Sequence, residues 1–411
     1  MIELTDIHLN SPETSKNVFP IYEKFRDADG IIWSRKHKAW IVSSFAHARK
    51  VLNNPSSSVQ KLAPFTANLD GDLRGKAEKM QQIMSHWLPF MDPPSHTRMR
   101  NILQVGFMPR AVAFHETALR AATVELLDEL AGRDQIEFLE DFASEVPARA
   151  IVYLYGLPAD QIPRIKRWAD GIAEFVLGSA KPGRYDKSLA MMQEMHSYFS
   201  EIVEAGVPPV RAGGAGSLMD LLLESRELPD GLTDEEIVST LILILFAAPE
   251  TTANMLLNAM FNLVGQPGAL EALAARPEDI PAAIEEAVRF DGPVPAVVRV
   301  AKETMNIGQE TISKGERIFI LLKSANRDSL AFDRPDELDL DRGRCPHMGF
   351  GSGIHMCVGA HLARLEARIA FEEFLKRYSG VEMVEQEIVW RDELLAHSPK
   401  ALQLKLVARD F

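Results

Sequence analysis

A cysteine framed by glycines is the most chemically suggestive feature of this 411-residue sequence. Residues 350–359 read F-G-S-G-I-H-M-C-V-G, and Cys357 is the cysteine of this run. Glycines let the backbone turn sharply and lie close against a flat ligand. After the cysteine, Leu362, Leu365 and Ile369 recur at helical spacing, so the sulfur is predicted to sit where a helix begins. The unpaired amides and positive dipole end of such a helix favour a thiolate, which is a metal ligand and a nucleophile.

The alternative interpretation of Cys357 is a free buried cysteine, which is usually inert. That interpretation explains neither the glycines nor His355, which lies two residues earlier. The only other cysteine is Cys345, and the two together fit neither a disulfide framework nor a zinc site. The pattern therefore favours a thiolate that the loop presents to a ligand.

An acid and an alcohol inside an apolar helix form the second candidate for chemistry. Thr233 to Val264 is the longest helical pattern, opened by a T-D-E-E cap and apolar nearly all round in its first half. Pro249 removes a backbone amide there, so a kink or a widened turn is expected. Glu250 and Thr251 follow, and a buried acid beside a proline needs a reason to exist. Alternatively, the hydroxyl of Thr251 simply bonds back to the carbonyl of Ala247.

Two further pairs of charged residues lie at helical spacing. In the stretch D-P-P-S-H-T-R-M-R, two prolines predict a helix start, and His96 and Arg100 lie four residues apart on one face. Taken alone, such a pair is more often a solvated face than a ligand site. Glu286 and Arg289, three residues apart, would by default be a surface ion pair that contributes little.

Together, these motifs resemble the cytochrome P450 haem-thiolate monooxygenases of the soluble bacterial type, over nearly the whole chain. The resemblance implies a mainly α fold with small β-sheets, in which haem lies between the long central helix and the helix after the cysteine loop. It implies a single domain over residues 1–411, with a β-rich lobe at about 28–60 and 296–320. It also implies that Cys357 is the axial ligand of the iron of haem b.

The resemblance assigns cofactor contacts to further residues. His96, Arg100 and His355 match positions that contact haem propionates, and Arg299 matches an arginine that reaches a propionate. Four cationic or donor groups for two carboxylates is a sensible balance. The other cofactor-binding positions are expected to be Phe350, Gly351 and Gly359.

The resemblance also assigns catalytic, structural and substrate roles. Glu250 and Thr251 match the acid and alcohol that deliver protons when dioxygen is activated, although Ala248 stands where glycine is common. Glu286 and Arg289 match a structural pair that braces the segment before the cysteine loop. The substrate pocket is expected to include Trp87, Phe175, Leu243, Phe246, Ala247, Val294, Val297 and Leu395.

The rest of the chain is expected to supply the scaffold. The pattern predicts helices at 19–26 and 45–52, with strands around I-I-W and A-W-I-V between them. Residues 61–90 show no clean period, and long irregular segments of this kind are either functional lids or disordered. The resemblance implies that this segment covers the substrate. Residues 107–199 have almost wholly helical periodicity.

Composition limits the partners. A net charge of −13 argues against nucleic acid or an anionic membrane as the main partner. No signal peptide and no run of ~20 apolar residues is recognised, so no membrane anchor and a reducing cytoplasm are expected. No flavin- or iron-sulfur-binding extension is visible, so electrons are expected from NAD(P)H through a ferredoxin or flavodoxin with its reductase. An acidic donor is expected to dock on a basic patch of four arginines, Arg98, Arg110, Arg364 and Arg368.

The expected function is insertion of one oxygen atom from dioxygen into an apolar small organic molecule. The alternatives are a peroxide-driven or oxidative-coupling haem-thiolate enzyme and, less in keeping with the motifs, a non-catalytic haem sensor. A peroxide-driven enzyme would usually discard the acid and the alcohol. A sensor would need an output domain or an exposed haem edge, and would have no use for proton delivery.

Overall fold

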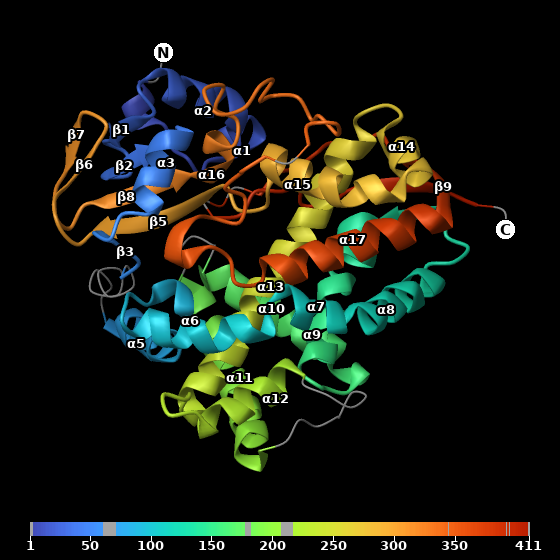
Figure 1. The fold of residues 1–411 in the computed structure, drawn as a ribbon, viewed down its shortest axis with the longest axis horizontal. Coiled ribbons are helices and arrows are strands. Elements are labelled where there is room, and N and C mark those ends of the chain that lie inside the picture. The colour runs from blue at the N-terminus through green and yellow to red at the C-terminus, as the bar shows by residue number, and fades with distance from the viewer. Residues whose placement is uncertain are drawn as a thin grey trace.

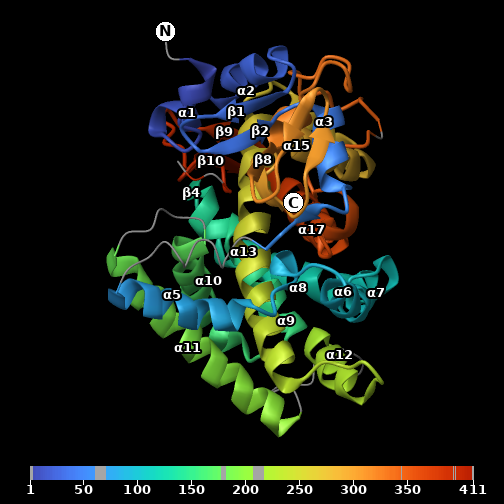
Figure 2. The ribbon, with the colours of Figure 1, turned by 90° about the vertical axis from the view of Figure 1, so that its left-hand side faces the viewer.

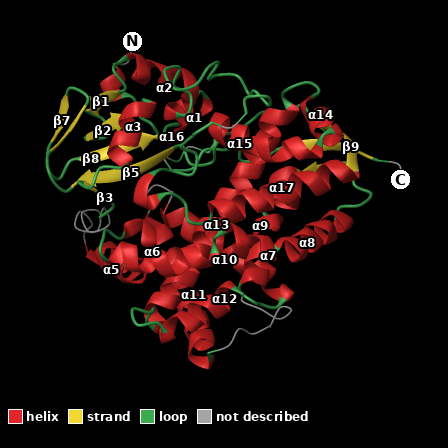
Figure 3. Cartoon of the chain, viewed as in Figure 1, coloured by secondary structure: helices red, strands yellow, loops and turns green. Residues whose placement is uncertain are grey.

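The computed structural model describes residues 3–60, 71–176, 182–206, 217–343, 345–391, 393 and 395–409. Helices dominate the described residues. The strands gather in two regions of the molecule, one beside the N-terminal helices and one beside the C-terminus (Figure 3). The larger strand region lies beside the N-terminal helices, and the helical layers fill the opposite side (Figure 1). The expected mainly α fold with small β-sheets is confirmed.

The largest sheet joins two segments that are far apart in the sequence. Its strands, in the order β1-β2-β8-β5-β3, are β1 (Ile31–Ser34), β2 (Ala39–Val42), β8 (Arg317–Leu321), β5 (Ala296–Ala301) and β3 (Ser57–Ser58). β2 and β8 run parallel, with Trp40 opposite Ile318, and the other neighbouring strands are antiparallel. The remaining strands form a three-stranded sheet and a hairpin, which comprise β4 (Gln135–Glu137), β10 (Gln403–Ala408) and β9 (Tyr378–Met383), and β6 (Met305–Ile307) with β7 (Glu310–Ile312).

Among the described residues, most of the α-helices precede the long central helix in the chain, and four follow it. The preceding helices are α1 (Pro12–Lys16), α2 (Val18–Asp27), α3 (Phe45–Leu52), α5 (Gly71–Met84), α6 (Ser95–Gly106), α7 (Pro109–Phe114), α8 (Glu116–Glu129), α9 (Glu145–Leu154), α10 (Ile162–Val176), α11 (Pro182–Ala205) and α12 (Leu218–Glu224). The central helix is α13 (Asp234–Val264), and α14 (Ala269–Ala275), α15 (Ile280–Asp291), α16 (Leu322–Ala325) and α17 (Ala360–Arg377) follow. Short 3₁₀ segments span Leu4–Asp6, Leu88–Phe90, Ala159–Gln161, Ser225–Glu227, Pro277–Asp279 and Gly353–His355, and a π-helical turn spans Leu139–Ala143.

Helix α13 runs through the middle of the molecule (Figure 2). It begins with the expected capping box, in which Thr233 accepts from the amide of Glu236 (3.3 Å) and its own amide donates to the Glu236 carboxylate (2.9 Å). The helix continues through Pro249 without interruption, so the expected kink or widening does not break it.

The apolar character of α13 matches burial inside the fold. By length and mean hydropathy alone α13 would be long enough to cross a membrane, although polar residues interrupt it and no run of ~20 apolar residues occurs in it. However, 72% of its most apolar window is buried by the rest of the protein, as in a helix at the centre of a core.

Part of the segment expected to be irregular is a helix. Residues 61–70 lie outside the described residues, but Gly71–Met84 forms α5. Ala77, Met80 and Met84 are buried at helical spacing, and Ile83 is buried beside them. The small Ala77 completes this stripe, and counting only the large apolar residues hid its period.

The Glu286–Arg289 pair is buried, so the surface interpretation of it is wrong. The two side chains are 3% and 0% exposed and form two hydrogen bonds of 2.8 Å. Glu286 also accepts from Arg342 Nε at 3.0 Å. The guanidinium of Arg289 donates at 2.8–2.9 Å to three backbone carbonyls, those of Asn326, Pro335 and Glu337. The pair therefore fixes the segment that leads to the cysteine loop.

We expect Arg289→Met to destabilise the protein by about 3–5 kcal/mol, because the charge of Glu286 would remain buried without its main partner. Urea unfolding followed by circular dichroism measures this change. Arg276→Met is the matched control, since Arg276 is 59% exposed and pairs with Asp279 at the same spacing. The control should cost less than about 1 kcal/mol, and equal losses in the two variants would contradict a bracing role.

Candidate active site

The cysteine loop has the backbone geometry that its glycines suggest. Gly351 and Gly353 have φ angles of 76° and 74°, a region that other residues rarely adopt. A Cβ on Gly353 would lie 2.6 Å from the carbonyl oxygen of Leu52, so the loop packs directly against the end of α3. The amide of Cys357 donates to the carbonyl of Phe350 (2.9 Å). α17 starts at Ala360, as the sequence predicts.

The thiol of Cys357 is accessible to solvent although protein surrounds it. Burial by the surrounding protein nevertheless raises the pKa of the thiol. These two observations agree if the sulfur lines an internal chamber. The amide of Gly359 and the charges of Arg100 and Arg364 act in the opposite direction and favour the thiolate. A metal ion at the sulfur would remove the proton outright.

Four buried or half-buried donor groups lie near this thiol and form no ion pair with a carboxylate of the described residues, although the charge of Asp92 acts on three of them, His96, Arg299 and His355. The rings of His96 and His355 lie 4.2 Å apart, and three of their four ring nitrogens are buried with no hydrogen-bond partner among the described residues. Arg299 is 7% exposed, and among the described residues its side chain donates only to the carbonyl of Val298. No carboxylate in the described chain forms an ion pair with Arg299 or Arg100. Burial, with repulsion from His96 and Arg299, lowers the pKa of His355 to about 3.

Such a set is unfavourable by itself, because buried polar groups in proteins are nearly always hydrogen-bonded. Two carboxylates would satisfy it, since they accept charge-assisted hydrogen bonds. The arrangement therefore suits a ligand that carries two acidic groups beside a flat body.

The buried part of helix α13 contains one short stretch of partly accessible residues. Between Glu236 and Met260, every residue is buried except residues 246–248, Glu250 and Thr251. The hydroxyl of Thr251 donates to the carbonyl of Ala247 (2.6 Å), so the alternative interpretation of this residue describes the observed hydrogen bond.

Glu250 is paired with a residue that its local sequence does not indicate. Arg391 Nη1 lies 3.1 Å from Glu250 Oε1, and the two side chains are 26% and 15% exposed. Burial raises the pKa of Glu250 to about 7, although Arg391 opposes this rise. The acid is therefore balanced between its two protonation states near neutral pH.

The residues expected to line the substrate pocket separate into two sets. Trp87 and Leu243 are buried, and Trp87 stacks on Phe246 with ring centroids 5.4 Å apart. Because Trp87 and Leu243 are buried, they lie behind the residues that a ligand could touch. Four others are partly accessible and suited to face a ligand, namely Phe246, Ala247, Val294 and Val297. Leu395 is half-buried against the cluster around Phe25, and the side chain of Phe175 lies outside the described residues.

Comparison with known proteins decides the family. The family model "Cytochrome P450" matches residues 172–275 and 280–406, which is more than half of the chain. This chain belongs to the cytochrome P450 family. A "Putative cytochrome P450 YjiB" of Bacillus subtilis is 30% identical over 89% of this chain and 88% of its own.

Two solved structures extend the likeness to the fold. P450BioI, in complex with an acyl carrier protein that carries hexadec-9Z-enoic acid, has a TM-score of 0.87 and is 27% identical, covering 96% of this chain and 100% of its own. CYP109E1 from Bacillus megaterium, in complex with testosterone, has a TM-score of 0.83 and is 28% identical, covering 96% and 99%. The protein is thus a haem monooxygenase of the bacterial P450 type, an oxidoreductase.

The residues of this P450 fit haem. The family implies haem as the cofactor, and its two propionates match the requirement of the unpartnered donors for two carboxylates. His96, Arg100, Arg299 and His355 would hold those propionates. Cys357 would supply the thiolate, whose donation to iron favours cleavage of dioxygen. Within the described residues, no cluster of three or more His, Cys, Asp or Glu side chains could hold a further metal ion.

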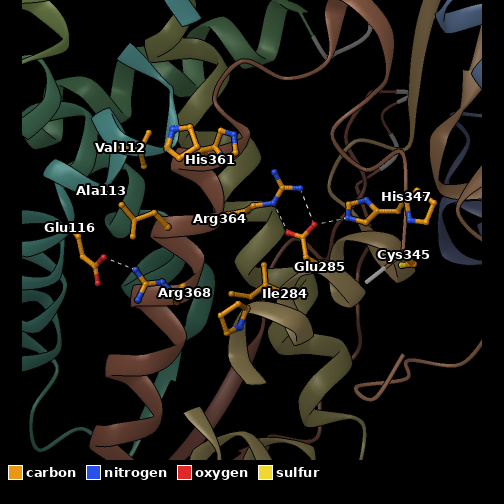
Figure 4. A pocket seen from close by; sticks show the side chains of 14 residues that line it. Val112, Ala113, Glu116, Ile284, Glu285, Cys345, His347, His361, Arg364 and Arg368 are labelled. Atoms are coloured by element: carbon orange, nitrogen blue, oxygen red, sulfur yellow. Dashed lines mark hydrogen bonds and ion pairs between the residues drawn. The ribbon is translucent and has the colours of Figure 1, made fainter. Parts of the chain in front are cut away.

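A groove of about 950 Å³ lies on the outer side of α17, close to the cysteine loop (Figure 4). Arg364 points toward Glu285 there, with N–O distances of 2.5 and 2.9 Å, and its guanidinium also lies over the ring of Phe350 at 4.2 Å. Although burial opposes it, hydrogen bonds from His347 and Arg364 lower the pKa of Glu285 to about 2. Each charge in this part of the groove is therefore matched by another.

The prediction of a basic patch is wrong, because three of its four arginines are paired with glutamates. Arg364 pairs with Glu285, Arg368 pairs with Glu116 and Glu372, and Arg98 pairs with Glu236. Among the four arginines, only Arg110 forms no ion pair in the described part of the chain. Sequence reasoning missed the partners because each glutamate comes from a different helix or lies at a spacing that was not counted.

Two other polar residues of the site also escaped the sequence analysis. Glu366 on α17 is 3% exposed, and it accepts from the side chain of Thr252 on α13. Burial raises the pKa of Glu366 to about 8. Arg391 is the second, and its pairing with Glu250 spans 141 residues, so no local spacing could reveal it. Glu366 does lie on the apolar face of α17, and an acid there is a signal that could have been read.

We expect Cys357→His to abolish the strongly red-shifted band of the reduced carbon monoxide complex, because that band depends on a thiolate ligand. Absorption spectroscopy of the purified holoenzyme measures it. Cys345→Ser is the control and should leave the band in place, since Cys345 lies in the outer groove. A Cys357→His protein that keeps the band would refute the assignment.

Proposed function

We propose that this P450 inserts one oxygen atom from dioxygen into an apolar small organic molecule, in the cytoplasm. Electrons would come from NAD(P)H through a ferredoxin or flavodoxin and its reductase. The observation that carries the proposal is the accessible stretch of α13, where an acid and an alcohol interrupt an otherwise buried apolar helix. The partly accessible Phe246, Ala247, Val294 and Val297 support an apolar substrate.

The names of two structural neighbours support the same substrate class. P450BioI was solved with a long-chain fatty acid on its carrier protein, and CYP109E1 with testosterone. Both ligands are largely apolar. A mainly apolar pocket with few polar groups binds such molecules by removing their surface from water.

Glu250 would hold the proton that the reaction consumes. Its pKa of about 7 allows it to take up a proton from water and to give it up again near neutral pH. Haem, when bound, supplies the activation of dioxygen. The protein's part is to deliver protons to it in a controlled way.

Thr251 would position water in this scheme. A hydroxyl has one donor and two acceptor lone pairs. The donor is used on Ala247, so the oxygen remains free to accept from a water molecule on the accessible side. Thr251 could fill this role while its hydroxyl stays bonded to Ala247, so its side chain need not rotate.

We expect Thr251→Ala to keep haem and substrate binding but to release hydrogen peroxide in place of product, because the water would lose its acceptor. Loss of one positioned group in proton delivery typically costs ~10²-fold or more in that step. Product and peroxide per NAD(P)H consumed are the quantities to measure. Thr251→Ser should restore coupling. The buried Thr252 offers a matched test, and uncoupling in Thr252→Ala alone would place proton delivery on the Glu366 side of the helix.

We further propose that the electron donor docks over the groove beside α17. Arg364 connects the groove to the cysteine loop, since it lines the groove, lies over the ring of Phe350 and acts through its charge on the thiol of Cys357. Helix α7, which contributes Pro109, Val112 and Ala113 to the groove, carries an exposed apolar side chain at each end. These are Met108 and Phe114, each 55% exposed, and Phe114 lines a neighbouring pocket. A donor with an apolar docking face fits this surface better than a strongly acidic one.

We expect electron transfer to depend only weakly on ionic strength, because the arginines of the groove are already paired. Shortening the Debye length from ~10 Å to ~3 Å should change the rate little. Stopped-flow reduction by the donor measures the rate. Met108→Glu should slow it more than Arg98→Glu, and Leu330→Glu at the 94% exposed Leu330 is the control. A steep loss of rate with salt would restore the model of an acidic donor.

A further inference from the structure

The segment 389–400, which we call the C-terminal hairpin, folds back on itself next to α13. Residues 392 and 394 lie outside its described residues. Its arms are joined by hydrogen bonds from Lys400 to the carbonyl of Val389 (2.7 Å) and from Arg391 to that of Ser398 (3.0 Å). These bonds hold Arg391 at a defined position in the first arm.

A polar stripe on α13 binds the C-terminal hairpin. Glu250, Asn254 and Asn258 are spaced four apart and therefore lie on one face of the helix. Each contacts the hairpin, and the contacts are Glu250 Oε1 with Arg391 Nη1 (3.1 Å), Asn254 Oδ1 with Ser398 Oγ (2.9 Å) and Asn258 Nδ2 with the carbonyl of His397 (3.0 Å). One turn further, Phe261 meets Trp390 edge to face at 5.4 Å. The stripe has no place in an all-apolar core helix unless it fixes this hairpin.

The second arm of the hairpin is anchored in the core. His397 is 3% exposed, and its Nδ1 lies 2.6 Å from the ammonium of Lys323, which also pairs with Asp291. Burial lowers the pKa of His397 to about 4, so the neutral ring accepts from Lys323. Its Nε2 contacts the carbonyl of Ser15 at 2.9 Å. Because these groups are buried and paired, the second arm is fixed at His397, and Arg391 lies opposite the next residue, Ser398, with its side chain partly exposed.

Arg391 is the cation that faces Glu250. The hairpin also contributes Glu393, whose carboxylate lies 4.0 Å from Arg391 Nη1, and α10 contributes Asp170. The negative charges of Glu393 and Asp170 favour the protonated form of Glu250, and the positive charge of Arg391 favours the ionised form. Glu250 Oε2 is buried and has no hydrogen-bond partner among the described residues, so one oxygen remains available for a proton.

We propose that Arg391 is a positioning residue for proton delivery, which holds Glu250 toward the C-terminal hairpin and sets how much of it is ready to donate. This inference rests on the proposed role of Glu250. Arg391 can bind either Glu250 or the neighbouring Glu393. When Arg391 pairs with Glu393, Glu250 takes a proton from water. Glu250 then passes that proton toward the haem side of α13 and returns to its ionised form, so protons balance over each cycle.

The test measures the protonation of Glu250 directly in the ferric, substrate-free holoenzyme. The carboxyl C=O stretching band is assigned by its loss in Glu250→Gln and then followed by infrared spectroscopy as a function of pH. Arg391→Met should raise the midpoint by ~1–3 pH units, because an opposite charge at this distance lowers a carboxyl pKa by that amount. Arg391→Lys should return it toward the wild-type value, and Glu393→Gln should lower it.

The same variants have a catalytic consequence with a defined sign. The protonated fraction of Glu250 falls as pH rises through its pKa, so Arg391→Met should move the alkaline loss of product per NAD(P)H to higher pH. Glu393→Gln should move it to lower pH. Should Arg391→Met fold poorly, Arg391→Gln provides the same test, because it also removes the positive charge that faces Glu250.

An unchanged midpoint in these variants, or no band lost in Glu250→Gln, would overturn the proposal. The proposed role of Glu250 is tested separately by the product and peroxide yields of Glu250→Gln. Normal coupling in Glu250→Gln, together with shifted midpoints, would show that Arg391 controls an acid that the reaction does not use.

Discussion

The structure depends on burying a 31-residue helix that is apolar nearly all round. A helix covered on every side can touch a ligand only where its neighbours withdraw, and around α13 this happens between Phe246 and Thr251. Proton-transfer groups on the helix are useful only within that stretch. The acid and the alcohol lie there, which explains why chemistry and packing coincide on one turn.

The charges around the site differ in whether the protein itself supplies their partners. On the outside of the fold, Arg364 is paired with Glu285 and Arg368 with Glu116, whereas Arg110 has no ion pair among the described residues. The four donors near Cys357 form no ion pair with a carboxylate of the described residues, and two of them, His96 and His355, are held neutral by burial. Such an arrangement is unstable unless a dianionic ligand completes it, so binding of haem and stability of the fold are linked.

The sequence predicted those features that depend on neighbouring residues. The glycine turns, the capping box at Thr233 and the start of α17 are local, and the structure has all three. The partner of Glu250, the charge of the arginine patch and the burial of Glu286 were not predicted, or were predicted wrongly. Each depends on which distant element packs nearby, and spacing along one helix carries no such information. Two interpretations based on helical spacing alone were corrected by the resemblance to a family, because both pairs belong to its motifs. Glu286 and Arg289 are not a surface pair, and His96 is buried and not part of a solvated face.

The parallel pairing of β2 with β8 has a consequence for how this chain reaches its folded state. Arg317 donates to the carbonyl of His37 across 280 residues, so the largest sheet closes only after most of the chain has been made. Contacts of such sequence separation form slowly, because a long loop must first be ordered. The cysteine loop packs on Leu52 and therefore joins the same late step. During synthesis, the edge of β2 that pairs with β8 remains without its partner until β8 has been made. In this period the nascent chain is most prone to aggregate and most accessible to chaperones.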